Sequence, residues 1–61
     1  MIQIHPDLNP LEVMLVDEEL KKRGITSYNL LPGNGCIWAY YNLVNEYYIF
    51  REGRLVDVQV D

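Results

Sequence analysis

The sequence predicts an α+β fold in which one helix packs on a three- or four-stranded antiparallel meander sheet. A capped, amphipathic segment covers residues 10–23, and three β-rich segments follow residue 35 with short connections between them. Glycine, proline and asparagine gather at the junctions. The chain has 61 residues, 49% of them hydrophobic and 23% charged, so we expect a single globular domain over 1–61.

The first segment, Ile2-Gln3-Ile4, alternates apolar and polar residues and is compatible with a short N-terminal strand. His5-Pro6 then ends it, because proline has no N–H to donate and restrains the residue before it. This strand is an optional addition to the predicted sheet.

The helix over about residues 10–23 has signals at both ends. Asn9 can cap it, Pro10 suits its first position, and Gly24 suits the left-handed residue after its end. Acid-to-base pairs at a spacing of four support it from within: Asp17–Lys21, Glu18–Lys22 and Glu19–Arg23.

The predicted helix has two apolar sides. Val13, Val16 and Leu20 form one stripe, which we expect to pack on the sheet. The other side carries a second patch: Leu11, Met14 and Leu15. We favour its being covered by the N-terminal segment, and the alternative is contact with another chain.

Residues 25–31 alternate weakly and are compatible with a strand, and Pro32-Gly33-Asn34-Gly35 predicts a turn. Three β segments follow: Cys36–Leu43, Tyr47–Arg51 and Arg54–Val60. The short loops between them favour an antiparallel meander.

Side-chain alternation divides the predicted sheet into two faces if both hairpin loops contain an even number of residues. Face one then holds Cys36, Trp38, Tyr40, Asn42, Tyr47, Ile49, Val56, Val58 and Val60. Face two holds Ile37, Ala39, Tyr41, Leu43, Tyr48, Phe50 and Leu55, with Glu46, Asp57, Gln59 and Asp61. We expect face one to form the core, because the last strand places its valines on this face and its polar residues on the other. A three-residue loop with a bulge at Gly53 would exchange the faces between the last two strands.

Face two is then too apolar for a solvated sheet face. We therefore predict a partner-binding surface there, formed by Tyr41, Tyr48, Phe50, Leu55 and Asp57. The alternative for each tyrosine is ordinary cross-strand packing with its hydroxyl in water.

Motifs for catalysis or metal binding are missing from the sequence. With one cysteine, Cys36, and one histidine, His5, a Cys/His metal cluster is excluded. Gly33-Asn34-Gly35 lacks the helix and lysine of a phosphate loop. We therefore expect no catalytic residues, no metal and no cofactor, and a protein that is not an enzyme. Without a signal peptide or an apolar run of membrane-spanning length, and with a single free cysteine, we expect a cytoplasmic protein and no membrane partner.

These features predict a small acidic protein-binding module, an inhibitor or accessory factor that docks on a larger protein through an aromatic sheet face. A phage or mobile-element origin is compatible with its size. A structural homo-oligomer, formed through the same face or the helix patch, is the first alternative. A single-stranded nucleic-acid binder is the second, and the net charge of −4 disfavours it.

Overall fold

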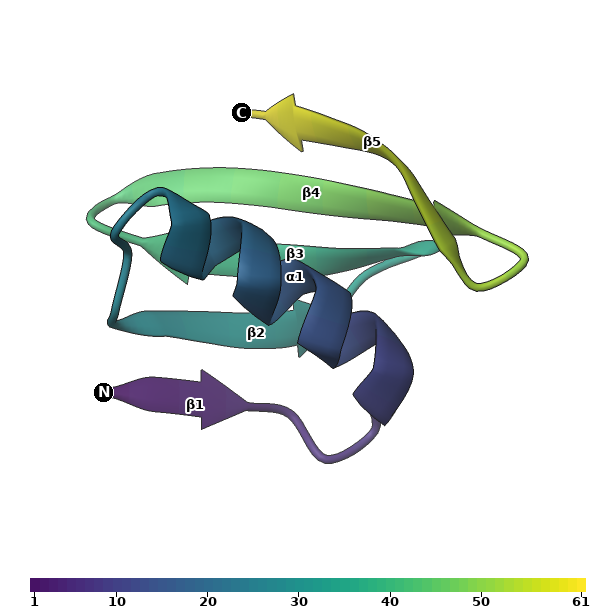
Figure 1. The fold of residues 1–61 in the computed structure, drawn as a ribbon, viewed down its shortest axis with the longest axis horizontal. Helices are drawn as coiled ribbons and strands as arrows, with labels where there is room; N and C mark the ends of the chain where they lie inside the picture. Colours follow the sequence, from purple (N-terminus) through teal and green to yellow (C-terminus); the bar gives the residue numbers. More distant parts are fainter.

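The computed structural model describes residues 1–61 and shows one helix lying on one face of a five-stranded mixed sheet (Figure 1). In chain order the elements are β1 (Ile2–Ile4), α1 (Pro10–Lys22), β2 (Tyr28–Pro32), β3 (Cys36–Tyr41), β4 (Val44–Arg51) and β5 (Arg54–Val60). The strands lie in the sheet in the order of the chain. The predicted α+β class and the short N-terminal strand are confirmed, but the sheet has five strands and is not purely antiparallel.

The parallel pair is β1 with β2, and it follows from the position of α1 between them. A helix that crosses over one face of the sheet returns the chain in its original direction. Ile2 lies beside Tyr28 and Ile4 beside Leu30, and the His5 N–H donates to the Leu30 carbonyl at 3.0 Å. The remaining strands pair antiparallel, as predicted.

The ends of α1 follow its sequence signals. The Asn9 side chain accepts a hydrogen bond from the Leu11 N–H at 2.9 Å, and Pro10 opens the helix. At the other end Gly24 has a φ of 76°, with its N–H on the Lys21 carbonyl and the Ile25 N–H on the Leu20 carbonyl. This is a Schellman motif, which closes the helix at Lys22 with Arg23 as its C-cap.

One of the three predicted acid-to-base pairs forms on α1, between Lys21 and Asp17 at 2.7 Å. Lys22 bonds Glu19 at 3.1 Å, and Arg23 leaves the helix surface for the sheet. At 13 residues, this single helix is too short to cross a bilayer.

The core lies between α1 and the face of the sheet that we expected to be exposed. Val16 and Leu20 of the helix are buried against the sheet residues Tyr28, Leu30, Ile37, Ala39 and Tyr48. The prediction that face one forms the core is therefore wrong. The valine pattern of β5 was misleading, because β5 lies at the sheet edge and its valines stay exposed.

The β3–β4 and β4–β5 loops, the two hairpin loops to which the even-number assumption applies, contain two residues each, since Tyr41 pairs with Val44 and Arg51 pairs with Arg54. The even-loop assumption holds for both. A register shift lies within the last pair of strands, where Phe50 faces Leu55 but Ile49 faces Asp57. Val56 is the extra residue of this bulge, so Val58 and Val60 turn to the helix side of the sheet.

Candidate functional site

The side of the sheet away from α1 has no element packed on it, and we call it the open face (Figure 1). Strand alternation brings six apolar residues to it, none of them fully buried: Leu31, Cys36, Trp38, Tyr40, Tyr47 and Ile49. Polar side chains of neighbouring positions join them: Asn29, Asn45, Asp57 and Gln59. The open face is thus an aromatic and aliphatic surface with amide groups among its rings.

Its centre is a fixed pair of aromatic rings on the adjacent strands β3 and β4. Trp38 and Tyr47 are direct cross-strand partners, with ring centroids 6.4 Å apart and planes at 22°. The Trp38 indole N–H donates to the Asn45 Oδ1 atom at 2.9 Å. Packing on one side and a hydrogen bond at the ring nitrogen hold the indole in one orientation, so little side-chain entropy remains to be lost on binding.

The rim of the open face carries few charges. Arg51 and Arg54 pair across the β4–β5 turn, and Asp57 lies on the edge strand β5. Five of the nine acids lie at the opposite side of the sheet: Glu12, Asp17, Glu18 and Glu19 on α1, and the buried Glu46 of β4. The net charge of −4 is therefore not the charge of this surface.

The helix side of the sheet contains a charged cluster that joins Arg23 to β4. Glu46 is only 3% exposed, and both of its oxygens accept from the Arg23 guanidinium, at 2.7 and 2.9 Å. The Tyr48 hydroxyl donates to Glu46 at 3.0 Å and accepts from Arg23. Arg23 also donates to the Tyr41 hydroxyl at 3.3 Å and lies over the Tyr41 ring.

The cluster fixes the protonation of its members. The hydrogen bonds from Arg23 lower the pKa of the Glu46 carboxyl despite its burial. Burial and the neighbouring Glu46 carboxylate raise the pKa of the Tyr48 and Tyr41 hydroxyls. Near neutral pH Arg23 and Glu46 are therefore charged and the two tyrosine hydroxyls are neutral. Each of the four groups is hydrogen-bonded to at least one other member of the cluster. This arrangement suits docking of the helix end rather than proton transfer.

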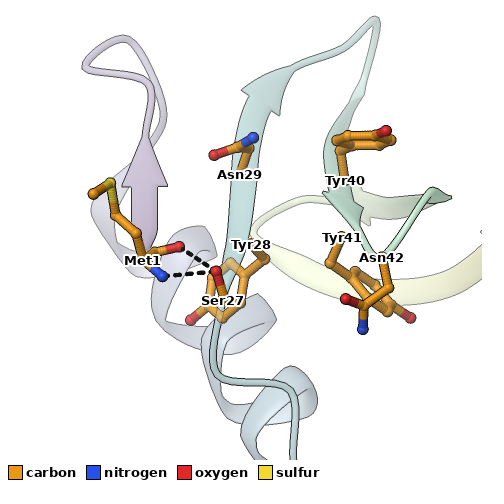
Figure 2. Close-up of a pocket in the computed structure, with 7 residues that line it drawn as sticks. All are labelled: Met1, Ser27, Tyr28, Asn29, Tyr40, Tyr41 and Asn42. Carbon is orange, nitrogen blue, oxygen red and sulfur yellow. Dashed lines mark hydrogen bonds between the residues drawn. The ribbon is translucent and has the colours of Figure 1, made fainter.

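The surface has only shallow hollows. One, of about 180 Å³, lies where the chain leaves β3 beside the start of β1 and β2, and its lining includes Tyr40, Tyr41 and Asn42 (Figure 2). At its wall the Ser27 hydroxyl accepts from the Met1 nitrogen at 2.6 Å and donates to the Met1 carbonyl at 3.0 Å. No cluster of three or more metal-ligating side chains exists.

The structure separates the residues of the predicted site. Tyr41, Phe50 and Leu55 are partly buried against the core beneath α1, and Tyr48 is fully buried within it. Asp57 lies apart from these four, on the opposite face of the sheet. Tyr48 is thus inaccessible to a partner in this fold, and the half-buried Trp38, Tyr40 and Tyr47 belong to the other face.

The second predicted patch remains uncovered on the outer side of α1. Leu11 and Met14 are exposed and Leu15 is partly buried. The N-terminal segment, which we expected to cover them, instead forms β1 at the sheet edge.

Sequence reasoning placed Trp38, Tyr40, Tyr47 and Ile49 in the core, whereas the structure places them on the open face. Asn45, which orients Trp38, was missed. Comparison of the chain with protein family models, curated proteins and solved structures finds no match.

Proposed function

We propose that this protein is a small non-enzymatic binding module that docks on a larger protein through the open face of its sheet. The observation that carries the proposal is the Trp38–Tyr47 pair, which is oriented by Asn45 and uncovered by any element of the fold. Tryptophan and tyrosine dominate the binding energy of many protein interfaces, above all where their rings are held in place before binding. A role as an inhibitor or accessory factor fits such a module.

The surroundings of the pair resemble the organisation of a protein interface. Tyr40, Leu31 and Ile49 extend the apolar area around the two rings, and asparagine and glutamine side chains stand between and beside them. Charged groups are confined to the rim. An apolar centre inside a polar rim is the usual arrangement of non-obligate interfaces.

The test is a comparison of partner capture by matched variants. Wild-type protein and Met14→Ser, which changes an exposed residue on the far side of α1, should capture the same partner from a lysate. Trp38→Ala and Tyr47→Ala should each weaken binding of the purified partner about 30-fold, the effect of losing a central hot spot. Thermal melts of each variant establish that it is folded. Capture that survives both substitutions in folded protein would contradict the proposal.

Single-stranded nucleic acid is the second candidate ligand, and a specific observation supports it. The stacked rings share the open face with Arg51, while four of the nine acidic residues lie on α1 behind the sheet. Such a surface could stack bases and pair with phosphates. The fluorescence of Trp38, the only tryptophan, reports directly on this face. A titration with oligonucleotides at low salt that leaves the emission unchanged removes this candidate.

A further inference from the structure

The edge strand β5 has no neighbour on its outer side and exposes three valines, Val56, Val58 and Val60 (Figure 1). It contains neither proline nor lysine, and the bulge at Val56 and the charges of Arg54 and Asp57 are the only protection of this edge. The opposite edge, β1, has three residues, whereas β5 has seven. The longer of the two free edges, with three exposed apolar side chains against two on β1, is therefore β5.

The backbone of β5 offers hydrogen-bonding groups at this edge. The Asp61 N–H donates inward to the Asn45 carbonyl at 2.9 Å, and Val60 faces Glu46. Because bonded positions alternate along an antiparallel strand, the N–H and C=O groups of Val60 and Val58 point outward. The Asp57 side chain accepts the Val58 N–H at 2.9 Å, as expected for a donor that has no strand beside it.

We propose that β5 pairs antiparallel with β5 of a second copy of this chain, so that the sheets of two protomers join into one. A two-fold axis perpendicular to the sheet generates such a pair. This symmetry requires that the side chains of two directly paired residues point to the same side of the joined sheet. Three registers satisfy this condition near the middle of the strand, centred on Asp57, Val58 or Gln59.

The charges of β5 select the register centred on Val58. In the register centred on Asp57, this carboxylate lies directly opposite the partner's Asp57. In the register centred on Gln59, Asp57 lies opposite the partner's Asp61. Like charges directly opposite each other destabilise a strand pair. Centring on Val58 instead places Asp57 opposite the partner's Gln59, an acceptor opposite a donor, and does so twice by symmetry. Asp57, which accepts from the Val58 N–H at 2.9 Å and from the amide of its own Gln59 at 3.4 Å, then exchanges these contacts for the amide of the partner's Gln59.

This pairing places the open faces of the two protomers on the same side of the joined sheet. Val58 of one strand then meets Val58 of the other on the helix side, where this side chain is 38% exposed in the single chain. The contact extends about 17 Å along five residues of each β5, Val56–Val60, and is narrow, so we expect a weak dimer with a Kd of tens of micromolar. The proposal uses the edge rather than the open face and is independent of the proposed function.

Sedimentation equilibrium between 5 µM and 1 mM tests it. Wild-type protein should convert from monomer to dimer across this range. Gln59→Lys, which pairs with Asp57 of the other copy, should tighten the dimer about tenfold, and Gln59→Glu should weaken it by a similar factor. Val58→Lys should leave only monomer. Ile4→Lys is the matched control on the other edge, since Ile4 is 46% and Val58 38% exposed, and it should dimerise as wild type does.

Two results would overturn the proposal. One is that wild-type protein stays monomeric at 1 mM, and the other is that folded Val58→Lys protein still dimerises. Weakening by both Gln59→Lys and Gln59→Glu would place Gln59 opposite itself and exclude the proposed register. A dimer that Trp38→Ala abolishes while Val58→Lys does not would use the open face instead. Circular dichroism of each variant establishes that it is folded.

Discussion

Arg23, the residue that ends the helix, and Glu46, in the middle of β4, form a two-pronged ion pair across the core boundary. Tyr48 and Tyr41 complete the cluster from β4 and β3. The pair determines where the end of α1 rests on the sheet, because a carboxylate buried to 3% exposure requires its partner at that position.

Arg23→Met should destabilise the fold by about 2 kcal/mol. Removing one partner of a fully buried pair costs ~3–5 kcal/mol, and water reaches this site because the Arg23 side chain is 43% exposed. The free energy of unfolding in urea measures the effect. Arg54→Met, an exposed arginine at a turn, is the control and should cost less than about 0.5 kcal/mol. If both variants lose the same free energy of unfolding, the ion pair does not hold the end of α1 on the sheet.

The double variant Arg23→Met/Glu46→Met should recover part of that loss. It removes both charges together, so no carboxylate is left buried without a partner, and apolar replacements of buried ion pairs are often neutral or stabilising. Urea unfolding of the double variant beside both single variants gives the coupling energy. A double variant less stable than Arg23→Met would contradict this account of the cluster.

Acid should destabilise the protein through Glu46. Its carboxyl has a lowered pKa in the fold because Arg23 donates to it, so its contribution to stability is present above the ordinary value of 4.5 and is lost as the pH falls through the lower, folded-state pKa. The free energy of unfolding should therefore decrease from about pH 4.5 downward. Glu46→Gln should flatten this decrease, and an unchanged slope in that variant would contradict the assignment.

Alkaline conditions should destabilise the protein through Tyr48. Burial and the Glu46 carboxylate raise the pKa of its hydroxyl above 10, so the stabilising contribution is complete below pH 10 and is lost as the pH rises toward the folded-state pKa. Urea midpoints between pH 9 and 11.5 measure the loss. Tyr48→Phe should show a shallower decrease over this interval, and a decrease as steep as that of wild type would assign the effect to other groups.

The sequence predicted local structure well and the choice of sheet face badly, for a physical reason. The two ends of α1 are determined by residues next to them in the sequence, Asn9 and Gly24. The conformations of the β3–β4 and β4–β5 loops are likewise determined by the residues within each loop. Which face the helix covers depends instead on long-range contacts, above all Arg23 with Glu46. Glu46 shares one side of β4 with the apolar residues Tyr48 and Phe50. A single acid among apolar residues on one side of a strand was the available signal that its carboxylate has a buried partner.

The edge of the sheet explains the remaining error. The alternation of Val56, Val58 and Val60 is a typical sign of a strand with one buried face, but these valines stay exposed beside α1 and a bulge at Val56 shifts the alternation. Neither the width covered by one helix nor the place of a bulge is encoded in local periodicity. The aromatic residues of the open face were therefore assigned to the core, and those on the helix side of the sheet to the surface.

The two hairpin loops share one backbone conformation but differ in sequence, which gives a last prediction. Asn42-Leu43 has φ values of 47° and 63°, and Glu52-Gly53 has 52° and 78°, so both loops have the left-handed geometry of type I′ turns. The second position of the first loop is Leu43, 86% exposed and strained by its positive φ, where the other loop has Gly53.

Leu43→Gly should therefore stabilise the fold by about 0.5–1 kcal/mol. It creates the Asn-Gly pair that type I′ turns favour and relieves a left-handed strain of ~1–2 kcal/mol, while the greater freedom of glycine in the unfolded chain offsets part of the gain. Gly53→Ala is the reciprocal variant and should destabilise by about 1 kcal/mol, since open space around the added Cβ leaves the positive φ as its only penalty. Urea unfolding measures both changes. A gain for Leu43→Gly together with a loss for Gly53→Ala is the diagnostic result, because a general effect of glycine on chain entropy would reverse both signs.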